Sequence, residues 1–82
     1  MREHEVEGHE RRFPNGGRIN GRIFIENEKY VAEVVTWNPR GEPIYLYRDL
    51  PRDTEEKSRE KMRGEWEDEC SLLAVQSQGV VV

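Results

Sequence analysis

Two turn signals divide residues 21–48 into three short segments that each favour a β-strand. The first signal, Asn27-Glu28, lies between two runs of β-branched and aromatic residues, and a turn centred there pairs Ile25 with Tyr30. The second, Asn38-Pro39-Arg40-Gly41, has Pro where φ must be about −65° and Gly where φ can be positive. Together the turns predict two antiparallel hairpins that share a middle strand.

The first turn also sets a register, because side chains alternate between the two faces of a sheet. It places Arg22 opposite Glu33, a favourable pair of charges across a ladder. For the second hairpin we expect Thr36 to lie opposite Ile44. One face is then mainly aliphatic, with Ile23, Ile25, Tyr30, Ala32, Val34, Ile44 and Leu46. The other is rich in aromatic residues, with Phe24, Val31, Val35, Trp37, Tyr45 and Tyr47.

A helix is predicted over residues 53–75. Asp53, followed three residues later by Glu56, has the form of a helix N-cap with a returning carboxylate. The apolar side chains form a stripe along the second half of this helix only: Met62, Trp66, Cys70 and Leu73. We therefore expect the second half to pack on the sheet and the first two turns to project into solvent.

The two ends of the chain carry weaker signals. Residues 1–17 are rich in charge and end in a turn, which predicts a solvated arm and loop or, alternatively, a further edge strand. Residues 76–82 form a C-terminal tail whose valines favour a short strand. The predicted fold class is α+β: a three-stranded antiparallel sheet over residues 18–48, four-stranded if the arm pairs, with one C-terminal helix packed on one face. All 82 residues are expected to form a single small domain.

Composition argues against several classes of function. The net charge is −4, which argues against direct nucleic-acid binding, because that function normally requires a basic surface. No apolar run approaches the ~20 residues of a membrane span, and the charged N-terminus lacks the apolar region of a signal peptide. The single cysteine rules out an internal disulfide. We expect a cytoplasmic protein that does not contact a membrane.

No pattern in the sequence predicts catalysis, a cofactor or a metal site. Cys70 lies on the apolar stripe of the helix, where a buried and unreactive thiol is expected. His4 and His9 are five residues apart with Gly8 between them, so they would not share a helix face as the zinc-protease motif requires. We therefore expect no enzyme activity.

Surplus apolar surface on the sheet is the feature that bears on function. One helix covers one face, and a contiguous apolar patch left on so small a protein usually marks an interface. We expect a small non-catalytic protein-binding module, and the predicted partner-binding residues are Phe24, Trp37, Tyr45, Tyr47, Glu65, Glu67 and Asp68. Three occupants of the second face remain open: a second copy in a homodimer, a different protein, or the chain's own arm and tail.

The size and acidity of the chain suggest, by analogy, a phage or mobile-element inhibitor of a host defence or nucleic-acid-processing complex, as anti-CRISPR proteins are. Its acidic helix would then meet a basic channel of that partner. A homo-oligomeric structural subunit is one alternative. Another is a nucleic-acid-binding or antitoxin-like regulator that uses Trp37 and Tyr45 with Arg11, Arg12, Arg18, Arg22 and Arg40. The order of the elements around Asp49-Leu50-Pro51 resembles small antitoxin domains of the HicB type, but the resemblance covers only this arrangement.

Overall fold

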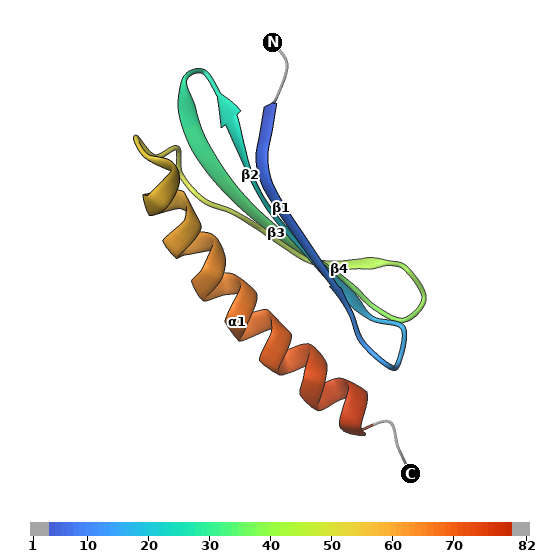
Figure 1. Cartoon of the computed structure of the whole chain (residues 1–82). Coiled ribbons are helices and arrows are strands. Elements are labelled where there is room, and N and C mark those ends of the chain that lie inside the picture. Colours follow the sequence, from blue (N-terminus) through green and yellow to red (C-terminus); the bar gives the residue numbers. More distant parts are fainter. Residues whose placement is uncertain (1–3, 80–82) are drawn as a thin grey trace.

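The computed structural model describes residues 4–79, which form a four-stranded antiparallel sheet and one long helix (Figure 1). The strands lie in the sheet in chain order, and the helix runs along one face. This arrangement confirms the predicted α+β class, with the N-terminal segment as the fourth strand. The elements are β1 (His4–Arg12), β2 (Arg18–Glu26), β3 (Lys29–Trp37), β4 (Pro43–Arg48) and α1 (Glu55–Gly79).

The hairpin of β2 and β3 has the predicted turn and register. Asn27 and Glu28 have positive φ angles of 51° and 64°, which is the backbone of a two-residue turn that suits the twist of an antiparallel pair. Ile25 lies opposite Tyr30, as the pattern of apolar residues indicates. The two faces of β2 and β3 are therefore the ones that the sequence predicts.

The turn between β3 and β4 is also the predicted one. The N–H of Asn38 donates to the carbonyl of Glu42 at 2.9 Å, and Gly41 has a φ of 85°, which only glycine adopts without strain. β4 begins at Pro43 and lies at the edge of the sheet, in agreement with the expectation that a proline opens an edge strand.

The predicted register of β4 is wrong by one residue. A bulge adds Ile44 to this strand, so that Thr36 lies opposite Tyr45 instead of Ile44. Because side chains alternate, the shift moves Tyr45 and Tyr47 to the face that α1 covers and moves Leu46 to the opposite face. The aromatic face predicted from the sequence is therefore divided between the two sides of the sheet.

β1 is the edge strand that the sequence offered as the alternative to a solvated arm. It pairs with β2, and His9 lies opposite Gly21. Three polar side chains of this strand reach α1: Glu7, His9 and Arg11. Val6 is the one hydrophobic side chain of β1 that packs against the core. Apolar alternation, the usual sign of a half-buried strand, is therefore missing from β1.

The core lies between α1 and the two central strands, and the predicted helix stripe is confirmed. The buried residues of the core are Phe13, Ile19, Ile23, Ala32, Val34, Met62, Cys70 and Leu73, and Trp66 is partly buried beside them. Gly21 allows α1 to approach closely, because a Cβ there would lie 2.8 Å from Trp66 Cε3 and 2.9 Å from Met62 Sδ.

α1 extends to Gly79, beyond the predicted residues 53–75, and it begins later. The hydroxyl of Thr54 caps the helix by accepting a hydrogen bond from the N–H of Lys57 at 3.3 Å. Asp53, the predicted cap, instead forms an ion pair with Lys29 of β3. The short strand predicted at Val80–Val82 falls outside the described residues.

The first two turns of α1 do not project into solvent, which corrects the prediction from the apolar stripe. Ser58 is fully buried, and its hydroxyl donates to the carbonyl of Tyr30 at 3.0 Å. A small residue whose hydroxyl is bonded can occupy the buried side of a helix, although its polarity hides that position in the sequence. Within residues 4–79, no helix has a stretch long and apolar enough to span a membrane.

Candidate protein-binding surface

The structure distributes the predicted partner-binding residues over three places. Phe24 and Trp37 face away from α1, whereas Tyr45 and Tyr47 share the face that α1 covers. The acidic residues Glu65, Glu67 and Asp68 lie on α1 itself. These residues therefore do not form one continuous surface, and their contact with a partner stays a prediction.

Phe24 is fully buried on the face opposite α1. Two guanidinium groups cover its ring: Cζ of Arg22 lies 4.5 Å and Cζ of Arg48 lies 4.9 Å from the ring centroid. Glu33 holds both cations in place, at 2.8 Å from Arg22 Nε and 3.5 Å from Arg48 Nη1. In this conformation Phe24 is part of the folded sheet and offers no surface to a partner.

Among the described residues, the large hydrophobic side chains that the sheet exposes all lie on β4. Ile44 and Leu46 have 51% and 63% of their surface exposed. Leu46 lies opposite the partly exposed Val35, on the face away from α1. We call Val35, Ile44 and Leu46 the β4 surface. The sequence does not reveal this surface, because the predicted register places Ile44 and Leu46 on the mainly aliphatic face with Val34.

Trp37 lies on the same face as the β4 surface and is partly exposed. The guanidinium of Arg18 lies over its ring, with Cζ 3.9 Å from the centroid. This contact covers one side of the indole and holds the Arg18 guanidinium against the ring. Trp37 can therefore extend the β4 surface only at its uncovered edge.

The backbone of β3 shows which of its residues bond to the chain that returns along β4. Tyr30 exchanges both backbone hydrogen bonds with Arg52, at 2.9 and 2.8 Å, and the carbonyl of Ala32 accepts from the N–H of Asp49 at 2.9 Å. Since bonded residues alternate along an antiparallel strand, the even-numbered residues of β3 direct their backbone groups towards β4.

The register then identifies the free backbone groups of β4. Tyr45 and Tyr47 lie opposite the even-numbered residues Thr36 and Val34, so their backbone groups bond to β3. By the same alternation, the N–H and carbonyl groups of Leu46 point away from β3, towards the open edge of the sheet. Leu46 thus combines the most exposed apolar side chain of β4 with backbone groups that point towards the open edge of the sheet.

Tyr45 connects β4 to α1. Its hydroxyl donates to the Glu65 carboxylate at 2.6 Å. This bond, together with burial and the charges of Glu65 and Glu69, raises the pKa of Tyr45 to about 12. Burial, followed by the charges of Glu65 and Asp68, raises the pKa of Glu69. Glu65 is thus engaged within the fold, whereas Glu67 and Asp68 are exposed.

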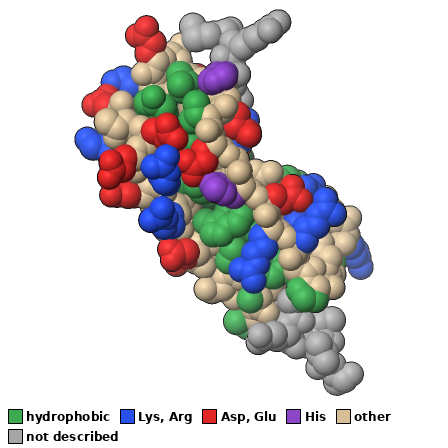
Figure 2. Space-filling model, viewed as in Figure 1, with side chains coloured by type: hydrophobic (Ala, Val, Ile, Leu, Met, Phe, Trp, Pro, Cys, Tyr) green, Lys and Arg blue, Asp and Glu red, His purple; other side chains and the backbone are tan. Residues whose placement is uncertain are grey.

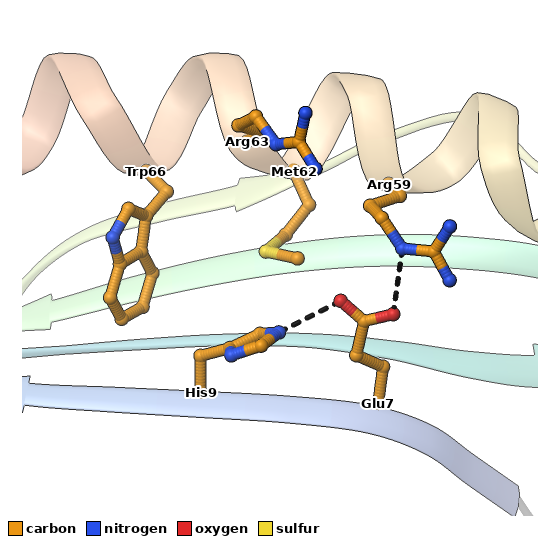
Figure 3. Close-up of a pocket in the computed structure, with 6 residues that line it drawn as sticks. All are labelled: Glu7, His9, Arg59, Met62, Arg63 and Trp66. Carbon is orange, nitrogen blue, oxygen red and sulfur yellow. Dashed lines mark hydrogen bonds and ion pairs between the residues drawn. The ribbon is translucent and has the colours of Figure 1, made fainter.

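A groove of about 220 Å³ separates α1 from β1 at the other side of the molecule (Figure 3). Oε1 of Glu7 accepts from Arg59 Nε at 2.9 Å, and Oε2 lies 2.8 Å from His9 Nε2. The bond to His9 and then the one to Arg59 lower the pKa of Glu7, against the opposing effect of burial. Both oxygens of Glu7 therefore already have partners in the chain.

Three further side chains of α1 line the groove: Met62, Arg63 and Trp66. The Trp66 ring lies edge-on to that of His9, with centroids 6.1 Å apart. Figure 2 shows hydrophobic side chains beside a histidine at this groove, bordered by acidic and basic side chains. The Glu7 carboxylate in this groove is paired with Arg59 and His9, so these contacts attach β1 to α1.

The structure offers little for chemistry at Cys70. Burial raises the pKa of this thiol, and the nearby guanidinium of Arg11 opposes the shift in part. The reactive thiolate form is therefore disfavoured at neutral pH. In the described part of the chain, no group of three His, Cys, Asp or Glu side chains is placed to hold a metal ion.

Comparison with protein-family models, with curated proteins and with solved structures gave no match to this chain.

Proposed function

We propose that this chain is a small, non-catalytic binding module that acts by protein–protein contact through the β4 surface. The observation that carries the proposal is the exposure of Ile44 and Leu46 on an edge strand whose backbone is also open. An apolar patch on a small protein usually marks an interface, and an open strand edge is a template for another strand. The partner is accordingly a protein, because another polypeptide can satisfy both features at once.

The placement of the basic residues argues against nucleic acid as the partner. Arg18 lies over Trp37, and Arg22 is bonded to Glu33 at 2.8 Å. Trp37 and Tyr45 lie on opposite faces of the sheet, so one strand of nucleic acid could not stack on both. The predicted combination of arginines with these two aromatic rings therefore does not form one surface.

The acidic second half of α1 supports a finer proposal, in which the chain uses this helix to bind and inhibit a protein of a nucleic-acid-processing complex. Glu67 and Asp68 are exposed, and α1 has no basic residue in its last turn. Such a helix has the charge needed to meet a basic channel of a nuclease, as an anti-CRISPR protein would. The contact at β4 does not depend on this finer proposal.

Site-specific photo-crosslinking tests the contact at β4. The photoreactive residue p-benzoylphenylalanine in place of Leu46 should give crosslinks to a second polypeptide, because this position would be buried in the complex. The same residue in place of Glu10, on the edge of β1, is the matched control and should give few. Equal crosslinking at both positions, or none at position 46, would contradict the proposed function.

A further inference from the structure

We propose that the partner of β4 is the β4 strand of a second copy of this chain, so that two sheets join edge to edge. This inference rests on the proposed function, because it names the partner of the β4 surface. The site that carries it is Leu46, which combines an exposed apolar side chain with backbone groups directed away from β3. A strand added at this edge satisfies those backbone groups, as in other cases of strand addition.

The order of residues along β4 is self-complementary. When two β4 strands run antiparallel about a two-fold axis at Leu46, this residue lies opposite its own copy, and the two exchange both backbone hydrogen bonds. On the face away from α1, the two Leu46 side chains then bury one another. On the other face, Tyr45 lies opposite Tyr47 of the second copy, an aromatic pair of the kind that stabilises cross-strand contacts.

The charges of β4 are compatible with this pairing. Arg48 is the single charged residue of the strand, and in the pairing it lies opposite Ile44 of the second copy. Its charge is already balanced within the chain, because Arg48 Nη2 lies 3.2 Å from Glu26 Oε2 and Nη1 lies 3.5 Å from Glu33 Oε2. Pairing therefore buries no unpaired charge at the centre of the interface.

The net charge of −4 acts against association at long range. Added salt screens this repulsion over distances of about 10 Å at 0.1 M ionic strength, and it leaves backbone and apolar contacts largely unaffected. Association through β4 should therefore strengthen when moderate salt is added. An interface held together by ion pairs would respond in the opposite way.

The experiment measures the mass of the full chain by sedimentation or light scattering over a concentration series. The wild-type chain should reach the mass of a dimer. Leu46→Pro removes the outward N–H without touching a bond to β3, and should weaken dimerisation by more than about tenfold. Glu10→Pro, at the open edge of β1, is the matched control and should leave the dimer intact. Circular dichroism checks that each variant is folded.

Leu46→Lys is the second variant, for the case in which proline unfolds β4. It keeps the backbone and places two ammonium groups opposite one another across the axis, so the chain should become monomeric. A wild-type chain that stays monomeric at every concentration overturns the inference, and so does a dimer that both substitutions leave intact. If the monomer still crosslinks from position 46 to a different protein, the proposed function stands and only the identity of the partner is wrong.

Discussion

The two edges of the sheet differ in how they meet solvent. Phe13 directly follows β1, and its N–H donates to the carbonyl of Gly17 at 2.8 Å. Since bonded residues alternate along an antiparallel strand, the odd-numbered residues of β1 from Glu7 onwards bond to β2. The outward backbone groups then belong to even-numbered residues, among them Glu10 and Arg12, whose side chains pair with each other at 3.0 Å. A strand added to β1 would have to desolvate this ion pair, whereas one added to β4 would cover Leu46.

The edges also differ in how firmly α1 holds them. Three side chains of β1 reach the helix: Glu7 contacts Arg59, His9 contacts Trp66 and Arg11 contacts Cys70. β4 reaches it through the hydrogen bond from Tyr45 to Glu65 and through the partly buried Tyr47. Charged edges resist pairing with other chains, and apolar ones invite it. The edge of the sheet at β1 is therefore protected from pairing with another strand, whereas the edge at β4 is open to it.

Gly21→Ala should break the attachment of β1 and has the largest expected effect. The new Cβ would lie 2.8 Å from Trp66 Cε3, so the indole would move away from the sheet and from His9. Overpacking of this kind lowers the free energy of unfolding by about 1–3 kcal/mol, which urea denaturation measures. Gly64→Ala is the control: a Cβ there meets nothing within 4 Å, and helix propensity should raise stability by up to about 1 kcal/mol.

Glu7→Gln should weaken the attachment of β1 to α1, because it removes the charge that links Arg59 to His9. The folded pKa of Glu7 is lowered, so its ionised form stabilises the fold above the unfolded pKa, and this contribution is lost as pH falls through the folded pKa. The variant should therefore be less stable than wild type at pH 7, and the difference should shrink below about pH 4. Glu60→Gln, on the exposed side of α1, serves as the control in thermal unfolding at both pH values. A difference that is the same at both pH values would show that the charge of Glu7 is not what fastens β1.

Tyr45→Phe has the smallest expected effect and tests the lighter attachment of β4. A pKa raised to about 12 means that the folded chain holds this proton more tightly than the unfolded chain. The stabilising contribution is complete below the unfolded pKa and is lost as pH rises towards 12. Burial and the Asp49 carboxylate also raise the pKa of Tyr47, so absorbance titration of the phenols should show one late-titrating tyrosine fewer in the variant than in the wild type. Glu65→Gln should bring that titration to lower pH, and an unchanged curve would rule out the bond to Glu65 as its cause.

The sequence predicted the elements whose local chemistry agrees with their packing. The turn at Asn27-Glu28 determines the register of the hairpin formed by β2 and β3. The apolar stripe from Met62 to Leu73 determines which side of α1 is buried. The bulge at Ile44 was not predictable, because both registers bury similar numbers of apolar residues. That one-residue shift decides whether Leu46 or Tyr45 lies on the face that α1 covers, so the candidate surface was missed although its strand was found.

β1 and the start of α1 were hidden for a different reason. Glu7, His9 and Ser58 occupy sites that face the helix or the sheet, and each satisfies its polar group with a partner distant in sequence or on the same strand. A hydrophobic pattern cannot report positions that are filled by bonded polar groups. Such positions become visible only when the partner strand and helix are in place.

Amide hydrogen exchange, followed by NMR as protein concentration is raised, tests most directly whether another strand pairs with the edge of the sheet at β4 and not with the edge at β1. We expect the protection of the Leu46 amide to increase with concentration, because its N–H becomes bonded to a second copy. The Glu10 amide, which also points outward, should exchange rapidly at every concentration. Protection at Leu46 that does not depend on concentration, or protection that increases at Glu10 instead, would contradict the pairing of two copies through β4.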